Sequence, residues 1–150
     1  MLFRSKKAYE KAGIANQVAG FCHQMGYAWR SASIAISRAG AGSVAEAWAN
    51  AAPTIFLPYP FHKDQHQKLN AAPLVKMGAA MMFTDKIEPQ ANAQQLNAPL
   101  QALMKNDPRR MHMAELMMKH RPEDGASALA KAITDRKSTR LNSSHLVISY

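Results

Sequence analysis

The stretch IAISRAGAGSVAEAWANAAPTIFL, residues 34–57, contains in order a short apolar run, a turn with two glycines, an alanine-rich segment and a second apolar run. This order predicts a strand over 34–37, a helix over 43–51 and a strand over 54–57. Pro53 ends the helix because proline has no N–H group to donate and restricts the residue before it. Because the second run is continuously apolar, we expect its strand to be covered on both faces of a parallel sheet.

The same alternation continues on both sides of this stretch. Gly78 stands just after a segment with helical spacing, where glycine commonly ends a helix. The remaining pattern predicts strands over 14–21 and 80–83 and helices over 23–31, 64–77, 89–105, 108–120 and 125–136. Strands that alternate with helices in this way indicate an α/β fold, here a Rossmann-like parallel sheet with flanking helices.

The composition is typical of a globular domain. The 150 residues are 47% hydrophobic and 19% charged, and a chain of this length forms one domain with a core. No run approaches the ~20 apolar residues that a membrane-spanning helix needs. The first residues lack the apolar stretch of a secretory signal, and a single cysteine, Cys22, excludes an internal disulfide. We therefore expect the protein in the cytoplasm.

The net charge of +9 is unevenly distributed. Residues 1–11 carry four basic side chains and one acidic one, and residues 136–150 carry three basic and no acidic ones, so the two ends hold two thirds of the net charge. After residue 135 the alanine-rich helical pattern also stops abruptly. We therefore assign the domain to residues 12–135, incomplete at its N-terminal side, treat 1–11 as a doubtful N-terminal end, and expect the native protein to cover roughly residues 6–135, with 136–150 a non-native or disordered tail.

The turn AGAGSVAE, residues 39–46, has two interpretations. In the first, Ser43 and Glu46 form a capping box, in which each side chain accepts from the other's backbone N–H, and Gly40 and Gly42 supply positive φ angles. In the second, the free N–H groups at the helix start hold a phosphate, Ser43 donates its hydroxyl, and Glu46 accepts from vicinal sugar hydroxyls. A glycine pair before a helix is a weak signal, so the turn alone does not decide between them.

The segment HKDQHQKLNA, residues 62–71, follows the next predicted strand. His62 and His66 have the spacing of two metal ligands on one helix face, but no third ligand stands in register, so we expect no metal site. Gln67 and Asn70 carry amides that both donate and accept hydrogen bonds, which suits the hydroxyl groups of a sugar. The alternative is a solvated first helical turn.

Two motifs at the correct separation carry a resemblance to a known family. They are the turn RAGAGSVAE at residues 38–46 and the helix start HKDQHQKLNA at residues 62–71. Together they resemble the C-terminal, donor-binding half of the MurG-like peptidoglycan N-acetylglucosaminyltransferases of glycosyltransferase family 28. The similarity covers about residues 15–135 and is densest over 21–80. It implies a partial C-terminal domain of a GT-B glycosyltransferase, incomplete at its N-terminal side.

The resemblance also implies which residues contact the donor substrate, UDP-GlcNAc. They are Phe21, Cys22 and Arg38 around the uracil, Ala41, Gly42 and Ser43 at the sugar and diphosphate, Glu46 at the ribose hydroxyls, and Gln67 and Asn70 at the GlcNAc hydroxyls. Gly42 stands where many relatives carry leucine, and Cys22 where an aliphatic residue is common. The contacts implied at these two positions run largely through the backbone, so both changes are compatible with binding.

The function implied is transfer of GlcNAc from UDP-GlcNAc to lipid I, the undecaprenyl-linked muramyl pentapeptide, to make lipid II for peptidoglycan. The family's reaction is an inverting displacement at the anomeric carbon, without a cofactor. We expect the catalytic residues and the acceptor site in an N-terminal domain that this chain lacks, and the chain alone to be inactive. The full enzyme is expected in the bacterial cytoplasm, peripheral on the inner face of the membrane, without nucleic-acid partners.

Two alternatives remain. One is another GT-B transferase that uses a UDP-sugar on a different lipid or small-molecule acceptor. The other is a non-enzymatic basic module that binds nucleic acid or an anionic membrane through the net positive charge.

Overall fold

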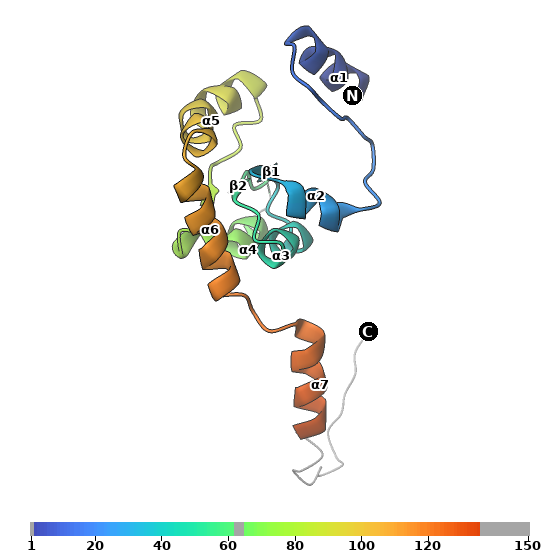
Figure 1. Cartoon of the computed structure of the whole chain (residues 1–150), viewed down its shortest axis with the longest axis vertical. Coiled ribbons are helices and arrows are strands. Elements are labelled where there is room, and N and C mark those ends of the chain that lie inside the picture. The colour runs from blue at the N-terminus through green and yellow to red at the C-terminus, as the bar shows by residue number, and fades with distance from the viewer. Residues whose placement is uncertain (1, 62–64, 136–150) are drawn as a thin grey trace. The chain divides into compact units, whose positions relative to one another are not determined.

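The computed structural model describes residues 2–61 and 65–135 (Figure 1). Along the chain, the elements of this described part are α1 (Leu2–Lys11), α2 (Met25–Ser31), β1 (Ala35–Ser37), α3 (Ala41–Ala49), β2 (Thr54–Phe56), α4 (His66–Lys76), β3 (Ala80–Met82), α5 (Pro89–Met104), α6 (Asp107–Lys119) and α7 (Gly125–Asp135). The chain divides into two units, residues 1–118 and residues 119–150. The first unit contains the sheet and all candidate residues.

The three strands form one parallel sheet in the order β1-β2-β3. Ile36 of β1 pairs with Ile55 of β2, which pairs with Met81 of β3. All three residues of β2 are buried, because it is the central strand and helices cover both faces of the sheet. The predicted α/β fold, a parallel sheet with flanking helices, is confirmed.

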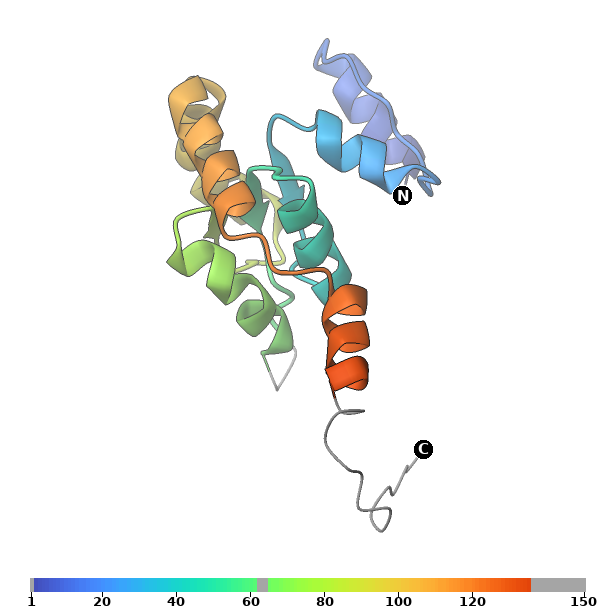
Figure 2. The same ribbon diagram turned by 60° about the horizontal axis from the view of Figure 1, so that its bottom comes forward.

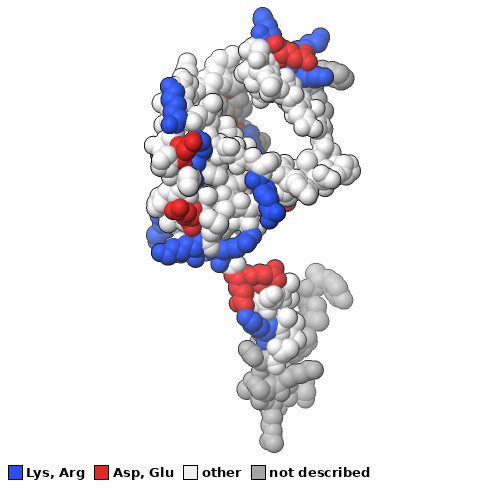
Figure 3. All heavy atoms as spheres, in the orientation of Figure 1, with Lys and Arg blue, Asp and Glu red and all other residues white. Residues whose placement is uncertain are grey.

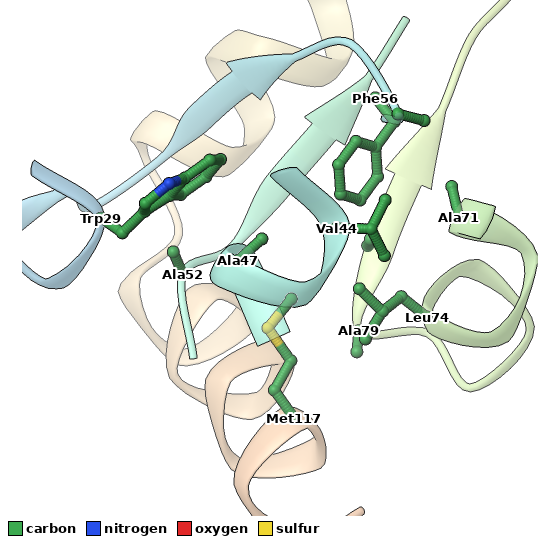
Figure 4. Packing of buried hydrophobic residues seen from close by; sticks show 11 residues of the cluster. Trp29, Val44, Ala47, Ala52, Phe56, Ala71, Leu74, Ala79 and Met117 are labelled. Atoms are coloured by element: carbon green, nitrogen blue, oxygen red, sulfur yellow. The ribbon is translucent and has the colours of Figure 1, made fainter. Parts of the chain in front are cut away.

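The core has two parts because successive side chains of a strand point to opposite faces. Phe56 packs on one face with the α3 and α4 side chains and with Met117, as Figure 4 shows. Ile55 packs on the other face with Leu96, Leu103 and Met113 from α5 and α6. Figures 1 and 2 show α3 and α4 side by side on their face of the sheet.

Gly78 ends α4 as the sequence predicts. Its φ of 80° lies in the left-handed region, its N–H donates to the Val75 carbonyl, and the Ala79 N–H donates to the Leu74 carbonyl. This pair of bonds is the Schellman arrangement, which satisfies carbonyls that the helix leaves unpaired. The chain therefore turns directly from α4 into β3.

The second unit contains α7. The Asp124 carboxylate accepts from the Ser127 N–H at 3.0 Å and caps the start of the helix. That bond lowers the pKa of Asp124 below its ordinary value, since it stabilises the ionised form. The tail after residue 135 lies outside the described residues, so the expectation for 136–150 stays a prediction.

The strand predicted over 14–21 is wrong. This segment is irregular, and Ile14 is 54% exposed, so it does not join the sheet. A strand needs a neighbour to pair with its backbone, and within the described residues this segment does not pair with the open edge of β1. The short apolar run is therefore not sufficient to form a strand here.

Candidate functional site

The loops that follow β1, β2 and β3 meet at one edge of the sheet, which we call the carboxyl edge. Because the strands are parallel, their carboxyl ends lie together, and such an edge is where open α/β sheets bind ligands. A hollow of about 260 Å³ opens there. Its lining residues are Ile36, Ser37, Arg38, Leu57, Asp85 and Asn92.

The start of α3 corrects the capping-box interpretation. The helix begins at Ala41, two residues earlier than predicted, and its N-cap is Gly40, without a side-chain cap. Ser43 is therefore the third helical residue, and Glu46 lies in the second turn, where it cannot reach back as the box requires. The first-turn N–H groups of Ala41, Gly42 and Ser43 have no intrahelical carbonyl to bind.

The glycines of this turn do not supply positive φ angles. Gly40 has a φ of −62°, and the glycines with positive φ in the described chain are Gly13 and Gly78. A Cβ atom added at Gly40 or Gly42 would meet no atom within 4 Å. The space beside the Cα atoms of Gly40 and Gly42 is therefore open, and a ligand has access to the backbone of the turn.

Two side-chain amides of α4, those of Asn70 and Gln67, hold the loops that follow β1 and β2. Asn70 Nδ2 donates to the Ala39 carbonyl at 3.2 Å, immediately before α3 begins. Gln67 Oε1 accepts from the Tyr59 N–H at 2.8 Å. These two bonds do not use Asn70 Oδ1 or Gln67 Nε2. The structure therefore places Asn70 beside the glycine turn, although 31 residues separate it from Ala39.

Glu46 has a partner that the sequence analysis did not select. Its Oε2 atom accepts from the indole Nε1–H of Trp29 at 2.8 Å. Trp29 comes from α2 and is 6% exposed, whereas Glu46 lies on the exposed side of α3. The bond therefore joins a buried donor to an exposed carboxylate.

Asp85 forms the most densely hydrogen-bonded group of the carboxyl edge. Its Oδ1 accepts from Asn92 Nδ2 at 2.6 Å and from the Ile87 N–H at 2.8 Å, and its Oδ2 pairs with Arg38. The bond from Asn92, followed by those from Ile87 and Arg38, lowers the pKa of Asp85 from 3.8 to about 2. Asp85 is therefore ionised at neutral pH.

Arg38 connects the three loops of the carboxyl edge. Its Nη1 donates to Asp85 after β3 and to the Leu57 carbonyl after β2, the latter at 3.0 Å. Its guanidinium carbon lies 5.7 Å from the centre of the Tyr59 ring, within the range of a cation–π contact. Because Arg38 lies in the loop after β1, its side chain links that loop to the loops after β2 and β3.

Phe21 and Cys22 lie on the irregular segment before α2. Phe21 is 73% exposed, and its ring makes an edge contact with the His23 ring at 4.7 Å between centroids. Cys22 is also exposed. In the part of the chain that the structure describes, neither side chain is joined to the glycine turn by a hydrogen bond or ring contact.

A comparison with protein families decides the family. The sequence profile described as "Glycosyltransferase family 28 C-terminal domain" matches residues 3–129. The chain belongs to this family. The resemblance that the two motifs indicated is thereby confirmed.

Named relatives agree with this assignment. A UDP-N-acetylglucosamine–N-acetylmuramyl-(pentapeptide) pyrophosphoryl-undecaprenol N-acetylglucosamine transferase from Alkalilimnicola ehrlichii is 35% identical over 130 residues, 87% of this chain and 36% of that protein. The protein of the same name from Geobacter metallireducens is 39% identical over 104 residues, 69% of this chain and 28% of that protein. The crystal structure of Acinetobacter baumannii MurG is similar with a TM-score of 0.76 and 26% identity, over 89% of this chain and 38% of that one. The chain thus spans about a third of the length of these relatives.

Three residues at or beside the candidate site were not predicted from the sequence. Asp85 had a usable signal, since a charged residue soon after a predicted parallel strand reaches the same edge as Arg38. Asn92 had no such signal, because it is neutral and lies inside the helix predicted over 89–105. Trp29 had none, because helical spacing places it on an apolar side without revealing which acceptor its indole reaches.

A second hollow, of about 360 Å³, lies away from the carboxyl edge. Its lining residues are Gln24, Gly26, Tyr27, Arg30 and Asn50, from α2 with the residue before it and from the end of α3. It contains none of the residues that the motifs selected. The smaller hollow at the carboxyl edge is therefore the candidate ligand site.

The described residues contain no group of three His, Cys, Asp or Glu side chains arranged to hold a metal ion. His62, one of the two histidines considered as ligands, lies outside that part of the chain. In the same described part, no helix is long and apolar enough to cross a membrane.

Proposed function

We propose that this chain binds UDP-GlcNAc as the donor-binding part of an enzyme that transfers GlcNAc to lipid I and so makes lipid II. The acceptor and the catalytic residues belong, in this proposal, to the part of the relatives that the chain does not span. The chain by itself then binds the donor without transferring its sugar.

The observation that carries the proposal is the start of α3 at the carboxyl edge. The helix has no side-chain cap, its first turn is open to ligands, and Asn70 is hydrogen-bonded to the residue just before its N-cap. Unpaired N–H groups and the positive end of the helix dipole favour an anion there. The diphosphate of UDP-GlcNAc is such an anion.

The surrounding side chains suit the remaining parts of the donor. Glu46 is an exposed carboxylate one turn into α3, as binding to ribose hydroxyls requires. Gln67 and Asn70 retain a polar atom each for the GlcNAc hydroxyls, and Phe21 and Cys22 are accessible for the uracil. Arg38 adds a positive charge at the hollow.

Donor binding at this position also assists the proposed reaction. When the acceptor oxygen bonds to the anomeric carbon, the bond from that carbon to the diphosphate oxygen breaks, and its electron pair leaves with UDP. The proton of the acceptor hydroxyl passes to a base in the part of the enzyme that the chain does not span. The N–H groups of Ala41, Gly42 and Ser43 stabilise the negative charge that develops there. We further propose that the complete enzyme works in the bacterial cytoplasm at the inner face of the membrane, where its lipid acceptor lies.

The charge distribution gives less support to a basic binding module. On the face shown in Figure 3, some Lys and Arg side chains gather in one band near the middle of the view, and elsewhere acidic side chains lie close to the basic ones. Two thirds of the net charge belongs to residues 1–11 and 136–150, where four basic side chains stand against one acidic and three against none. If the full chain binds DNA and a chain trimmed to residues 12–135 does not, the binding comes from the charged ends and not from the domain.

The test is ligand-observed NMR of the full chain with UDP-GlcNAc, with CDP and free GlcNAc as ligand controls. We expect saturation of the uridine and ribose signals, and about tenfold weaker binding by Glu46→Ala, since a hydrogen-bonded charge is lost. Glu115→Ala is the matched control, because Glu115 is a helical glutamate, 65% exposed, that the proposal does not use. The proposal fails if a folded chain gives no response to UDP-GlcNAc, or an equal response to CDP.

A further inference from the structure

The bond between Trp29 and Glu46 places a constraint on a side chain that is otherwise mobile. A glutamate on an exposed helix face samples several rotamers, and fixing one of them costs conformational entropy. Here Oε2 is held by an indole N–H that is itself fixed in the core, where Trp29 packs near Ala47 and Ala52 (Figure 4). Glu46 is therefore ordered before any ligand arrives.

The bond also leaves Glu46 able to bind a ligand. A carboxylate has two oxygens and about four acceptor sites, and the indole uses one of them. Because indole donates and never accepts, Trp29 cannot compete with Glu46 for the hydroxyl protons of a ligand. The arrangement is thus suited to hold a carboxylate for a pair of adjacent hydroxyl groups.

We propose that Trp29 is a positioning residue for the donor site, one that holds the Glu46 carboxylate ready for the vicinal hydroxyls of the ribose in a nucleoside diphosphate sugar. This inference rests on the proposed function, since it requires the donor to bind at α3. Trp29 itself does not touch the ligand. It acts by lowering the entropy that Glu46 loses on binding.

The chain offers a matched control in its second tryptophan. Trp48 lies on α3 two residues after Glu46, and its indole Nε1–H donates to the Met117 carbonyl at 3.0 Å. Both indoles donate one hydrogen bond beside the same core cluster. Replacing either by phenylalanine removes an N–H donor and some packing, but only the change at position 29 releases Glu46.

The first measurement needs no ligand. The chain has two tryptophans, so a ¹⁵N–¹H spectrum has two indole signals, which Trp29→Phe and Trp48→Phe assign. We expect Glu46→Ala to shift the Trp29 signal and to leave the Trp48 signal in place. An unchanged Trp29 signal would mean that the bond does not form in solution and would overturn the inference.

The second measurement is a double-mutant cycle on UDP-GlcNAc affinity. We expect Trp29→Phe to weaken binding about fivefold, Trp48→Phe to leave it within about twofold, and Trp29→Phe to have no further effect in a Glu46→Ala background. A purely structural role for Trp29 predicts the same loss in both backgrounds and would overturn the inference while the proposed function stands. Failure of the folded wild-type chain to bind UDP-GlcNAc would overturn both.

Discussion

Arg38 and Asp85 are 47 residues apart in the sequence, yet their side chains form an ion pair that joins the loop after β1 to the loop after β3. The Asp85 side chain is 4% exposed and the Arg38 side chain 52% exposed. The pair therefore has a shielded negative end and a positive end that borders the hollow. The pair therefore holds the loops after β1 and β3 together at the carboxyl edge.

Acid should weaken the fold through Asp85. Its pKa is about 2 in the folded chain and 3.8 ordinarily, so its stabilising contribution is fully present above about pH 4 and is lost as the pH falls toward 2. We expect Asp85→Asn to be less stable than the wild type near neutral pH, and the difference in unfolding free energy to shrink between pH 4 and pH 2. Urea unfolding followed by circular dichroism across this range measures it.

Asp107→Asn controls for the loss of one negative charge, since Asp107 is 76% exposed and pairs with Arg110 at the start of α6. A constant difference between wild type and Asp85→Asn from neutral pH to pH 2 would contradict the prediction.

Leu74 is expected to contribute strongly to stability. It is fully buried on α4 between the helix and the sheet, so Leu74→Ala removes apolar contacts and leaves a cavity, at a cost of about 3 kcal/mol in unfolding free energy. Leu69→Ala is the control on the same helix, because Leu69 is 65% exposed, and its cost should stay below about 0.5 kcal/mol. Equal losses for the two variants in urea unfolding would show that α4 does not pack as described.

Gly78 and Gly26 should respond to alanine with opposite signs. Gly78 has a φ of 80°, so Gly78→Ala strains the backbone and should lower the unfolding free energy by about 1 kcal/mol. Gly26 lies in α2 with open space around its Cα, so Gly26→Ala should raise it by about 0.5 kcal/mol. Thermal unfolding of both variants tests the pair, and a stabilised Gly78→Ala protein would be the contrary result.

The Asn70→Ala variant should show whether Asn70 contacts the GlcNAc part of the donor or only supports the nucleotide site. If its amide binds GlcNAc hydroxyls, Asn70→Ala weakens UDP-GlcNAc binding about fivefold and UDP binding less. The alternative is that Asn70 acts only by holding the Ala39 carbonyl, and then both ligands lose affinity equally. Calorimetric titration with the two ligands separates these outcomes, and Asn97→Ala, a change on the exposed side of α5, is the control.

Much of the fold could be predicted because it depends on neighbours in the sequence. The apolar runs around Ile36, Ile55 and Met81 became the three strands, and Gly78 ended α4. The strand predicted over 14–21 was wrong because an apolar run forms a strand only when its backbone pairs with another strand, and this segment does not pair with the open edge of β1. The start of α3 was placed two residues late because Ser43 and Glu46 match a capping pattern that the glycine turn made unnecessary.

The sequence by itself determined the order of strands and helices from residue 25 to residue 135, the family and the two motifs, since each depends on short-range spacing. It did not predict α1, and it placed a strand over 14–21 that the fold does not contain. Only the tertiary structure decided the partners of the functional side chains. Trp29 reaches Glu46 across 17 residues, and Arg38 reaches Asp85 across 47. The physical reason is that a hydrogen bond depends on atoms within about 3 Å, and only the packing of α2 on α3 and the parallel order of the sheet bring those atoms together.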